Sequence, residues 1–66
     1  MFINEAIKKA LENGCYIATG ELKEVFKIEP TNEMRGCIVH SIGSQDGSTW
    51  SPTAEDLIRD DYILIP

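Results

Sequence analysis

The chain has few of the residues that build catalytic or metal centres. It contains two cysteines, Cys15 and Cys37, and one histidine, His40. These three residues do not form the paired ligand spacing of a zinc site, and two cysteines can form at most one disulfide. No apolar run approaches the roughly 18 residues of a membrane-spanning helix. We therefore expect no resident metal, no cofactor and no membrane span.

Positive charge is also scarce. Six lysines and arginines stand against eleven acidic residues, which gives a formal net charge of −5. The basic residues are scattered along the chain, so a footprint for a nucleic-acid backbone is not expected. Met1-Phe2-Ile3 leads straight into an amphipathic segment, which is not the pattern of a signal peptide. The composition predicts an acidic cytoplasmic protein.

Sixty-six residues are enough for one domain, spanning 1–66. A chain this short buries only about 60% of the surface that its unfolded form exposes. Without disulfides or a metal, association between copies is the remaining way to stabilise such a core. We expect a homodimer or a homotetramer.

Residues 3–13 predict a helix, because apolar residues recur there at helical spacing. Asn13-Gly14 is a good stop, since glycine tolerates the left-handed conformation that ends helices. Strands are predicted at 15–19, 22–29, 36–42 and 48–50, with Asp46-Gly47 as a hairpin turn before the last of them.

Pro52 ends the fourth strand, and Ser51 or Thr53 can cap a short helix at 53–59, with Arg59 in its last turn. Residues 62–65 predict a final strand that is apolar on both faces, which favours a central position or burial in an interface. The short connections favour antiparallel pairing. The predicted fold is therefore α+β: a small, mainly antiparallel sheet, an N-terminal helix packed on it, and a short helix before the last strand.

No constellation for catalysis is evident, and we do not expect an enzyme. Cys37 and His40 are three residues apart in a predicted strand, so they point to opposite faces. The cysteines are typical of core packing, and His40 is typical of a paired residue in a sheet. The carboxylates near the short helix lack the spacing and glycine of a calcium loop, and are interpreted as capping and solvated residues; they are Glu55, Asp56, Asp60 and Asp61.

Trp50 is the most distinctive residue. An indole ring can stack on a purine, which contributes about 1–3 kcal/mol per base. A single tryptophan can equally anchor a core or a contact between subunits. The residues alone leave both interpretations open.

Several motifs together resemble a known family. Trp50 and Pro52 end a strand, Asp56-Leu57 lies in a polar helical turn, and Asp61-Tyr62 opens a β tail. The N-terminal Glu5-Ala6-Ile7, Ala10-Leu11 and Gly14, and the central Phe26-Lys27-Ile28, are similar to the same family's opening helix and middle strand. The pattern resembles the second type of phage Thoeris anti-defence protein, a signal-sequestering sponge.

The resemblance implies a small α+β protein that assembles into dimers of dimers in the cytoplasm of an infected bacterial host. Members of that family bind a cyclic ADP-ribose-type immune signal without degrading it; some relatives are implied to hold other cyclic nucleotides. On this resemblance, the ligand-binding residues expected here are Trp50, Thr49, Phe26, Arg35 and Lys27. Trp50 and Phe26 would stack on the base, Thr49 would offer a hydroxyl, and Arg35 or Lys27 would face a pyrophosphate.

The chain also departs from the family pattern. A basic residue followed by a Gly-Trp pair usually comes after the first strand, whereas residues 18–22 here are Ala-Thr-Gly-Glu-Leu. An expected aromatic and an expected cation are therefore missing, and the segment between Pro30 and Gly36 is shorter than usual. The alternative hypothesis is a protein-directed inhibitor, resembling an anti-CRISPR protein, whose acidic surface mimics nucleic acid against a basic host effector.

Overall fold

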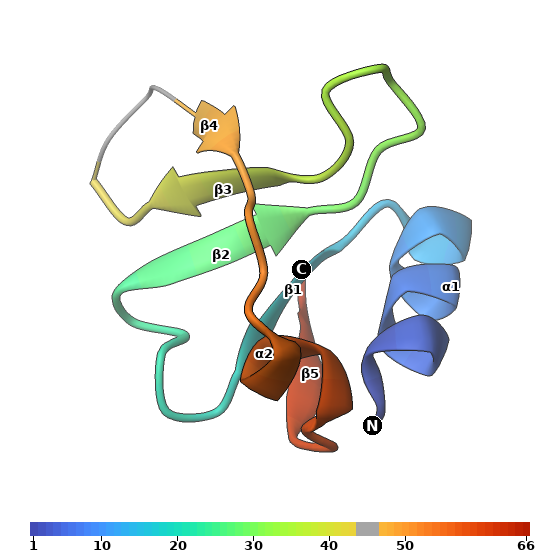
Figure 1. The fold of residues 1–66 in the computed structure, drawn as a ribbon, viewed down its shortest axis with the longest axis vertical. Helices are drawn as coiled ribbons and strands as arrows, with labels where there is room; N and C mark the ends of the chain where they lie inside the picture. Colours follow the sequence, from blue (N-terminus) through green and yellow to red (C-terminus); the bar gives the residue numbers. More distant parts are fainter. Residues whose placement is uncertain (44–46) are drawn as a thin grey trace.

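The computed structural model describes residues 1–43 and 47–66. The elements follow in the order α1 (Ile3–Asn13), β1 (Tyr16–Thr19), β2 (Phe26–Glu29), β3 (Ile38–Ser41), β4 (Gly47–Thr49), α2 (Ala54–Ile58) and β5 (Tyr62–Ile65). The strands form a five-stranded sheet with the order β4-β3-β2-β1-β5, and each pairing is antiparallel. The predicted α+β architecture is confirmed (Figure 1).

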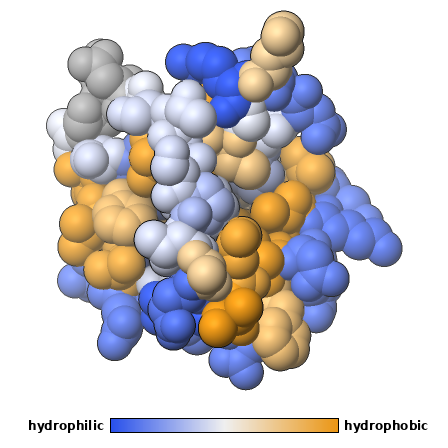
Figure 2. All heavy atoms as spheres, viewed as in Figure 1, coloured by the Kyte–Doolittle hydropathy of each residue, from blue (hydrophilic) through white to orange (hydrophobic). Residues whose placement is uncertain are grey.

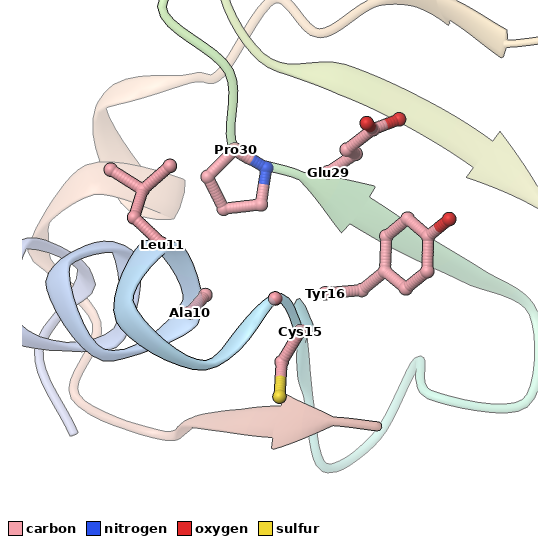
Figure 3. A pocket seen from close by; sticks show the side chains of 7 residues that line it. Ala10, Leu11, Cys15, Tyr16, Glu29 and Pro30 are labelled. Atoms are coloured by element: carbon pink, nitrogen blue, oxygen red, sulfur yellow. The ribbon is translucent and has the colours of Figure 1, made fainter.

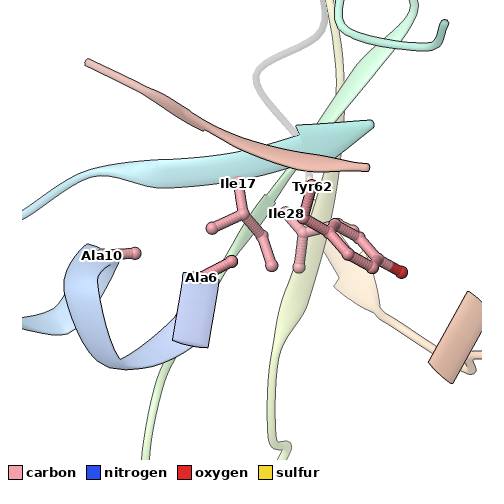
Figure 4. Close-up of a cluster of buried hydrophobic side chains, with 5 residues drawn as sticks. All are labelled: Ala6, Ala10, Ile17, Ile28 and Tyr62. Atoms are coloured by element: carbon pink, nitrogen blue, oxygen red, sulfur yellow. The ribbon is translucent and has the colours of Figure 1, made fainter. Parts of the chain in front are cut away.

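Helix α1 covers one face of the sheet through its smallest residues. Ala6 and Ala10 are fully buried, and they pack with Ile17, Ile28 and Tyr62 in the core cluster. Figure 4 shows Ile17 next to the alanines of α1, with Ile28 beside it and the Tyr62 ring extending away from the helix. Because alanine is small, the helix backbone can approach the sheet closely.

The helix ends where the sequence predicts. Gly14 has φ 67°, and its backbone N–H donates to the carbonyl of Ala10. This left-handed conformation is easy for glycine and strained for other residues. The chain then turns directly into β1, which begins two residues later.

The crossover from β4 to β5 carries α2 over the same face as α1. Of the two predicted caps, Thr53 is the one used. Its hydroxyl accepts from the N–H of Asp56 at 3.2 Å, and the Asp56 carboxylate accepts from the N–H of Thr53 at 2.8 Å. None of the α2 residues is buried. Instead, the buried Tyr62 hydroxyl donates to the backbone carbonyl of Asp56 and holds α2 beside the core.

Arg59 lies just beyond α2, at the C-cap, rather than in the last turn of the helix. Its guanidinium donates to both carboxylate oxygens of Asp61 at 2.7 and 2.6 Å, and to Glu21 at 3.4 Å. The hydrogen bonds and charge of Arg59 hold the pKa of Asp61 below its usual value. Arg59 therefore links the start of β5 to the turn that follows β1.

Two predicted strands are shorter in the structure. Residues 20–25 form consecutive turns instead of the start of β2; Val25 and Phe26 both donate their N–H to the carbonyl of Leu22. These local hydrogen bonds take the place of ladder bonds to a neighbouring strand. Gly36 has φ 74°, which is not an extended conformation, so β3 begins only at Ile38. Asp46, in the predicted hairpin turn, lies outside the described residues, and Gly47 already belongs to β4.

The prediction of a central β5 is wrong for a single chain, because β5 is an edge strand. Only Tyr62 is buried, while the other three residues are half-buried. Met1 lies along the outer edge: its carbonyl accepts from the N–H of Tyr62 at 3.1 Å, and its amino group donates to the carbonyls of Asp60 and Tyr62. The alternative, burial of β5 in an interface, stays a prediction.

Hydrophobic side chains also reach the surface on the helix-covered side. Figure 2 shows one area between α2 and α1 and another over the start of β2. Leu57 and Ile58 of α2 are exposed. Away from α2, Val25 and Ile42 are exposed as well, and the Ile42 N–H donates to the Val25 carbonyl. A chain of this size thus leaves a large part of its apolar surface in contact with water.

The core contains one polar group that gains little from burial. Thr19 is 6% exposed, and its hydroxyl has no hydrogen-bond partner among the described residues.

We predict that Thr19→Val raises the free energy of unfolding by about 1 kcal/mol, because it removes an unsatisfied buried polar atom. Urea denaturation followed by tryptophan fluorescence measures the change. Thr31→Val is the matched control: the Thr31 hydroxyl accepts from the N–H of Glu33, so that variant should gain nothing. A loss of stability in Thr19→Val would contradict the prediction.

A second prediction concerns the Tyr62 hydroxyl and the pH dependence of the free energy of unfolding. Tyr62→Phe should lower the free energy of unfolding by about 1 kcal/mol near neutral pH, because the bond to Asp56 is lost. Burial, and then the nearby charge of Asp56, raises the pKa of Tyr62 above the usual 10.0. The unfolded chain therefore loses this proton first, and wild-type stability declines as the pH rises above about 10. Phenylalanine has no proton to lose, so the difference between the two proteins should shrink between pH 9 and 11. A constant difference in denaturant titrations over this range would refute the assignment.

Candidate functional site

The face of the sheet opposite the two helices, here called the open face, carries two rows of side chains. Strand register places one residue from each strand in each row, and residues two apart along a strand share a face. The rows follow from the observed pairings. They are Ile65, Tyr16, Glu29, Ile38 and Thr49, and Ile63, Ala18, Lys27, His40 and Gly47.

Four of these residues meet at the centre and form what we call the open-face cluster: Tyr16, Lys27, Glu29 and His40. His40 Nε2 lies 2.9 Å from Glu29 Oε1. The His40 ring meets the Tyr16 ring edge-on, with 5.7 Å between centroids. Lys27 Nζ lies 4.1 Å from the centroid of the Tyr16 ring, within the range of a cation–π contact. All four side chains are half-buried.

The cluster therefore combines three kinds of group on one surface. Lys27 and His40 are directly opposite each other in the β2–β3 register and offer N–H donors. Tyr16 offers an aromatic ring, and Glu29 offers an acceptor. Such a set can bind a small planar molecule that carries both charge and hydrogen-bonding groups.

Gly47 of β4 makes room for the His40 ring. A Cβ atom at this position would lie 2.8 Å from His40 Cε1 and 2.5 Å from Ile38 Cγ2. Real Cβ atoms do not approach so closely, and any side chain here would push the ring or the strand away. Gly47 was predicted to be a turn residue, but its role in the structure is this close approach.

A small cavity adjoins the cluster at the end of α1 (Figure 3). Its volume is about 190 Å³, which is less than the roughly 300 Å³ at the lower end of ordinary ligand pockets. Tyr16 and Glu29 belong both to the cavity wall and to the cluster. The remaining walls are mostly apolar; they are formed by Ala10, Leu11, Gly14, Cys15 and Pro30.

The structure separates the five residues that the sequence predicts as the ligand site. Lys27 belongs to the cluster, and Thr49 lies on the same face, opposite Ile38 in register. Phe26 alternates with Lys27 and so lies on the helix-covered face. Trp50 is half-buried and packs against the core cluster. Its backbone N–H donates to the backbone carbonyl of Cys37. Its observed contacts are those of a core residue.

Phe26 and Trp50 lie on the same face of the sheet but far from each other. Phe26 pairs with Ser41, at one end of β3, and Trp50 is bonded to Cys37, just before the other end. Four residues of strand span about 13 Å. Arg35 is exposed in the segment between β2 and β3. Within one chain, these residues do not line one site.

Sequence reasoning missed Tyr16, Glu29 and His40 as site residues. His40 was predicted to be a paired sheet residue, and its contact with Glu29 agrees with that. The signal available in the sequence is the period-two spacing of Lys27 and Glu29, which puts both on one face. The spacing does not reveal which residues of β1 and β3 lie beside them.

Metal and membrane features can be stated for the described part of the chain. There, no group of three or more His, Cys, Asp or Glu side chains is placed to hold a metal ion. Cys15 and Cys37 are free and half-buried, and both pack against the core, as predicted. Among the described helices, none has the length and apolar character to cross a bilayer.

Comparison with known proteins indicates no family for this chain: no family model, no curated protein and no solved structure matches it. The resemblance to the Thoeris anti-defence family therefore stays a prediction based on the motifs given above.

The geometry at Gly47 gives a direct test of the cluster. Gly47→Ala should displace the His40 ring, and we expect a changed His40 side-chain signal in NMR spectra together with a loss of about 1–3 kcal/mol in stability, as for other overpacked sites. Gly20→Ala is the control, because a Cβ there meets no atom within 4 Å. An unchanged His40 environment in Gly47→Ala would contradict the arrangement.

Proposed function

We propose that this protein binds and sequesters a small anionic nucleotide signal of the cyclic ADP-ribose or cyclic nucleotide type, without degrading it. The observation that carries the proposal is the open-face cluster, where Lys27 and His40 lie side by side next to the Tyr16 ring. Phosphate oxygens need such donors, and a base or ribose needs an aromatic or apolar surface.

Tyr16 takes the role of the stacking ring in this proposal. Its ring already contacts Lys27 and His40, whereas Trp50 is engaged with the core. Thr49 extends the same face with an exposed hydroxyl. A ligand that also touched Phe26 or Trp50 would have to contact those residues on a second copy of the chain, since they lie on the other face.

Self-association is part of the proposal, as a homodimer or homotetramer. The cavity of about 190 Å³ beside the cluster is too small to enclose a whole nucleotide, so one chain provides only part of the required burial. The half-buried isoleucines at one end of the open-face rows, Ile63 and Ile65, lie on an edge strand. A second copy placed there would cover apolar surface and complete the walls of the site.

Net negative charge does not oppose this function, because binding of an anion depends on the groups that converge in one place. Sequestration needs affinity and abundance only. It needs no reacting group. The proposed setting is the cytoplasm of an infected bacterial host, where removal of a diffusing signal would silence the defence that it activates.

Binding and self-association can be measured together. Native mass spectrometry of the wild type with cyclic ADP-ribose and cyclic dinucleotides should show an oligomer carrying intact ligand, which is recovered with unchanged mass after denaturation. Lys27→Met should weaken binding roughly tenfold or more, because a charge-assisted contact is removed. Lys23→Met is the matched control, since Lys23 is exposed in the turn before β2.

The other outcomes separate the alternatives. A monomer that binds none of these nucleotides would refute the proposal. If a pull-down from host lysate with this protein instead recovered one host protein in stoichiometric amount, the protein-directed inhibitor would be the better explanation. Ligand recovered with an altered mass would indicate an enzyme.

A further inference from the structure

We infer that the anion subsite of the open face lies at His40 and Lys27, and that in the free protein the carboxylate of Glu29 holds the position that a ligand's phosphate would take. This inference rests on the proposed function. It adds His40 as a ligand-binding residue and Glu29 as an internal competitor.

The carboxylate shows where a negatively charged oxygen fits. Glu29 Oε1 lies 2.9 Å from His40 Nε2, which is hydrogen-bonding distance. Lys27 is the cross-strand neighbour of His40 on the same face, so a bound anion at this position would lie within reach of both. Lys27 now rests on the Tyr16 ring at 4.1 Å, and its flexible stem allows it to turn toward a phosphate.

Glu29 can leave this position without a change in the fold. Its side chain is 46% exposed, whereas that of His40 is 22% exposed, so the carboxylate has solvent to move into while the imidazole stays in place. Exposed pairs of this kind are weak. On its other side the ring lies close to Gly47, where a Cβ atom would come within 2.8 Å of His40 Cε1.

Displacement of Glu29 would also enlarge the binding surface. Glu29 and Tyr16 both line the adjoining cavity. A carboxylate that turns away would free the part of the cavity wall next to Tyr16. A competitor that is part of the same chain lowers the apparent affinity for every anion that needs this position.

The test measures the affinity for cyclic ADP-ribose and for cyclic di-AMP by isothermal titration calorimetry. Glu29→Ala should bind roughly tenfold more tightly than the wild type, because a competing negative charge a few ångströms from the phosphate is gone. Glu33→Ala makes the same change of net charge at an exposed residue of the segment between β2 and β3, and should bind like the wild type. His40→Gln should bind more weakly, and Glu29→Ala should give no gain in that background.

Each result bears on the inference. If the wild type binds a probe and Glu29→Ala binds it no more tightly, or if the gain persists in His40→Gln, the inference is wrong and the proposed function stands. An equal gain in Glu33→Ala would attribute the effect to net charge and overturn the inference in the same way. If neither the wild type nor Glu29→Ala binds either probe, the proposed function itself fails for these ligands. Should Glu29→Ala not fold, Glu29→Gln removes the charge while keeping the side-chain length.

Discussion

The structure depends on the close packing of Ala6 and Ala10 against Ile17, Ile28 and Tyr62. Two buried alanines on one side of α1 allow the helix to lie against the sheet with little space between them, so a short chain obtains a dense core from few residues. The arrangement also limits the protein, because 66 residues provide helices for only one face. The open face therefore has no helix over it, and most of its side chains are at least partly exposed, although Ala18 and Ile38 are buried.

The second face-covering element, α2, is held by polar contacts and contributes little apolar burial. Polar contacts replace the hydrophobic contact that such a short helix cannot make. They are the capping pair of Thr53 and Asp56, the hydrogen bond of the Tyr62 hydroxyl, and the ion pairs of Arg59. These contacts surround the point where the chain passes from the β4 edge to the β5 edge. The crossover brings β5 next to β1, and the buried ring of Tyr62 then joins the core formed by the N-terminal half of the chain.

Local features of this fold can be predicted from the sequence, and the site cannot. Helix α1 ends at Gly14 and α2 begins at Thr53 because each signal acts within one turn of its own residue. The cluster of Tyr16, Glu29 and His40 comes from three strands, and its assembly depends on register. That register is determined by the turns at 20–25 and by the segment before β3, where glycine conformation and local hydrogen bonds displaced the predicted strand ends. The edge position of β5 likewise depends on where the connection through α2 leads the chain, which the capping signal at Thr53 does not specify.

Under the proposed function, an acidic protein would have to bind an anion locally, and the open-face cluster is where it could do so. A free Lys27–His40 pair on a surface would attract any passing anion, whereas the observed pair is already satisfied: Lys27 by the Tyr16 ring and His40 by Glu29. Both groups therefore keep favourable contacts within the protein itself. Under the proposed function, a ligand would have to replace these contacts with better ones, which would favour a molecule that brings an anionic group and a planar ring together over a simple anion that brings charge alone.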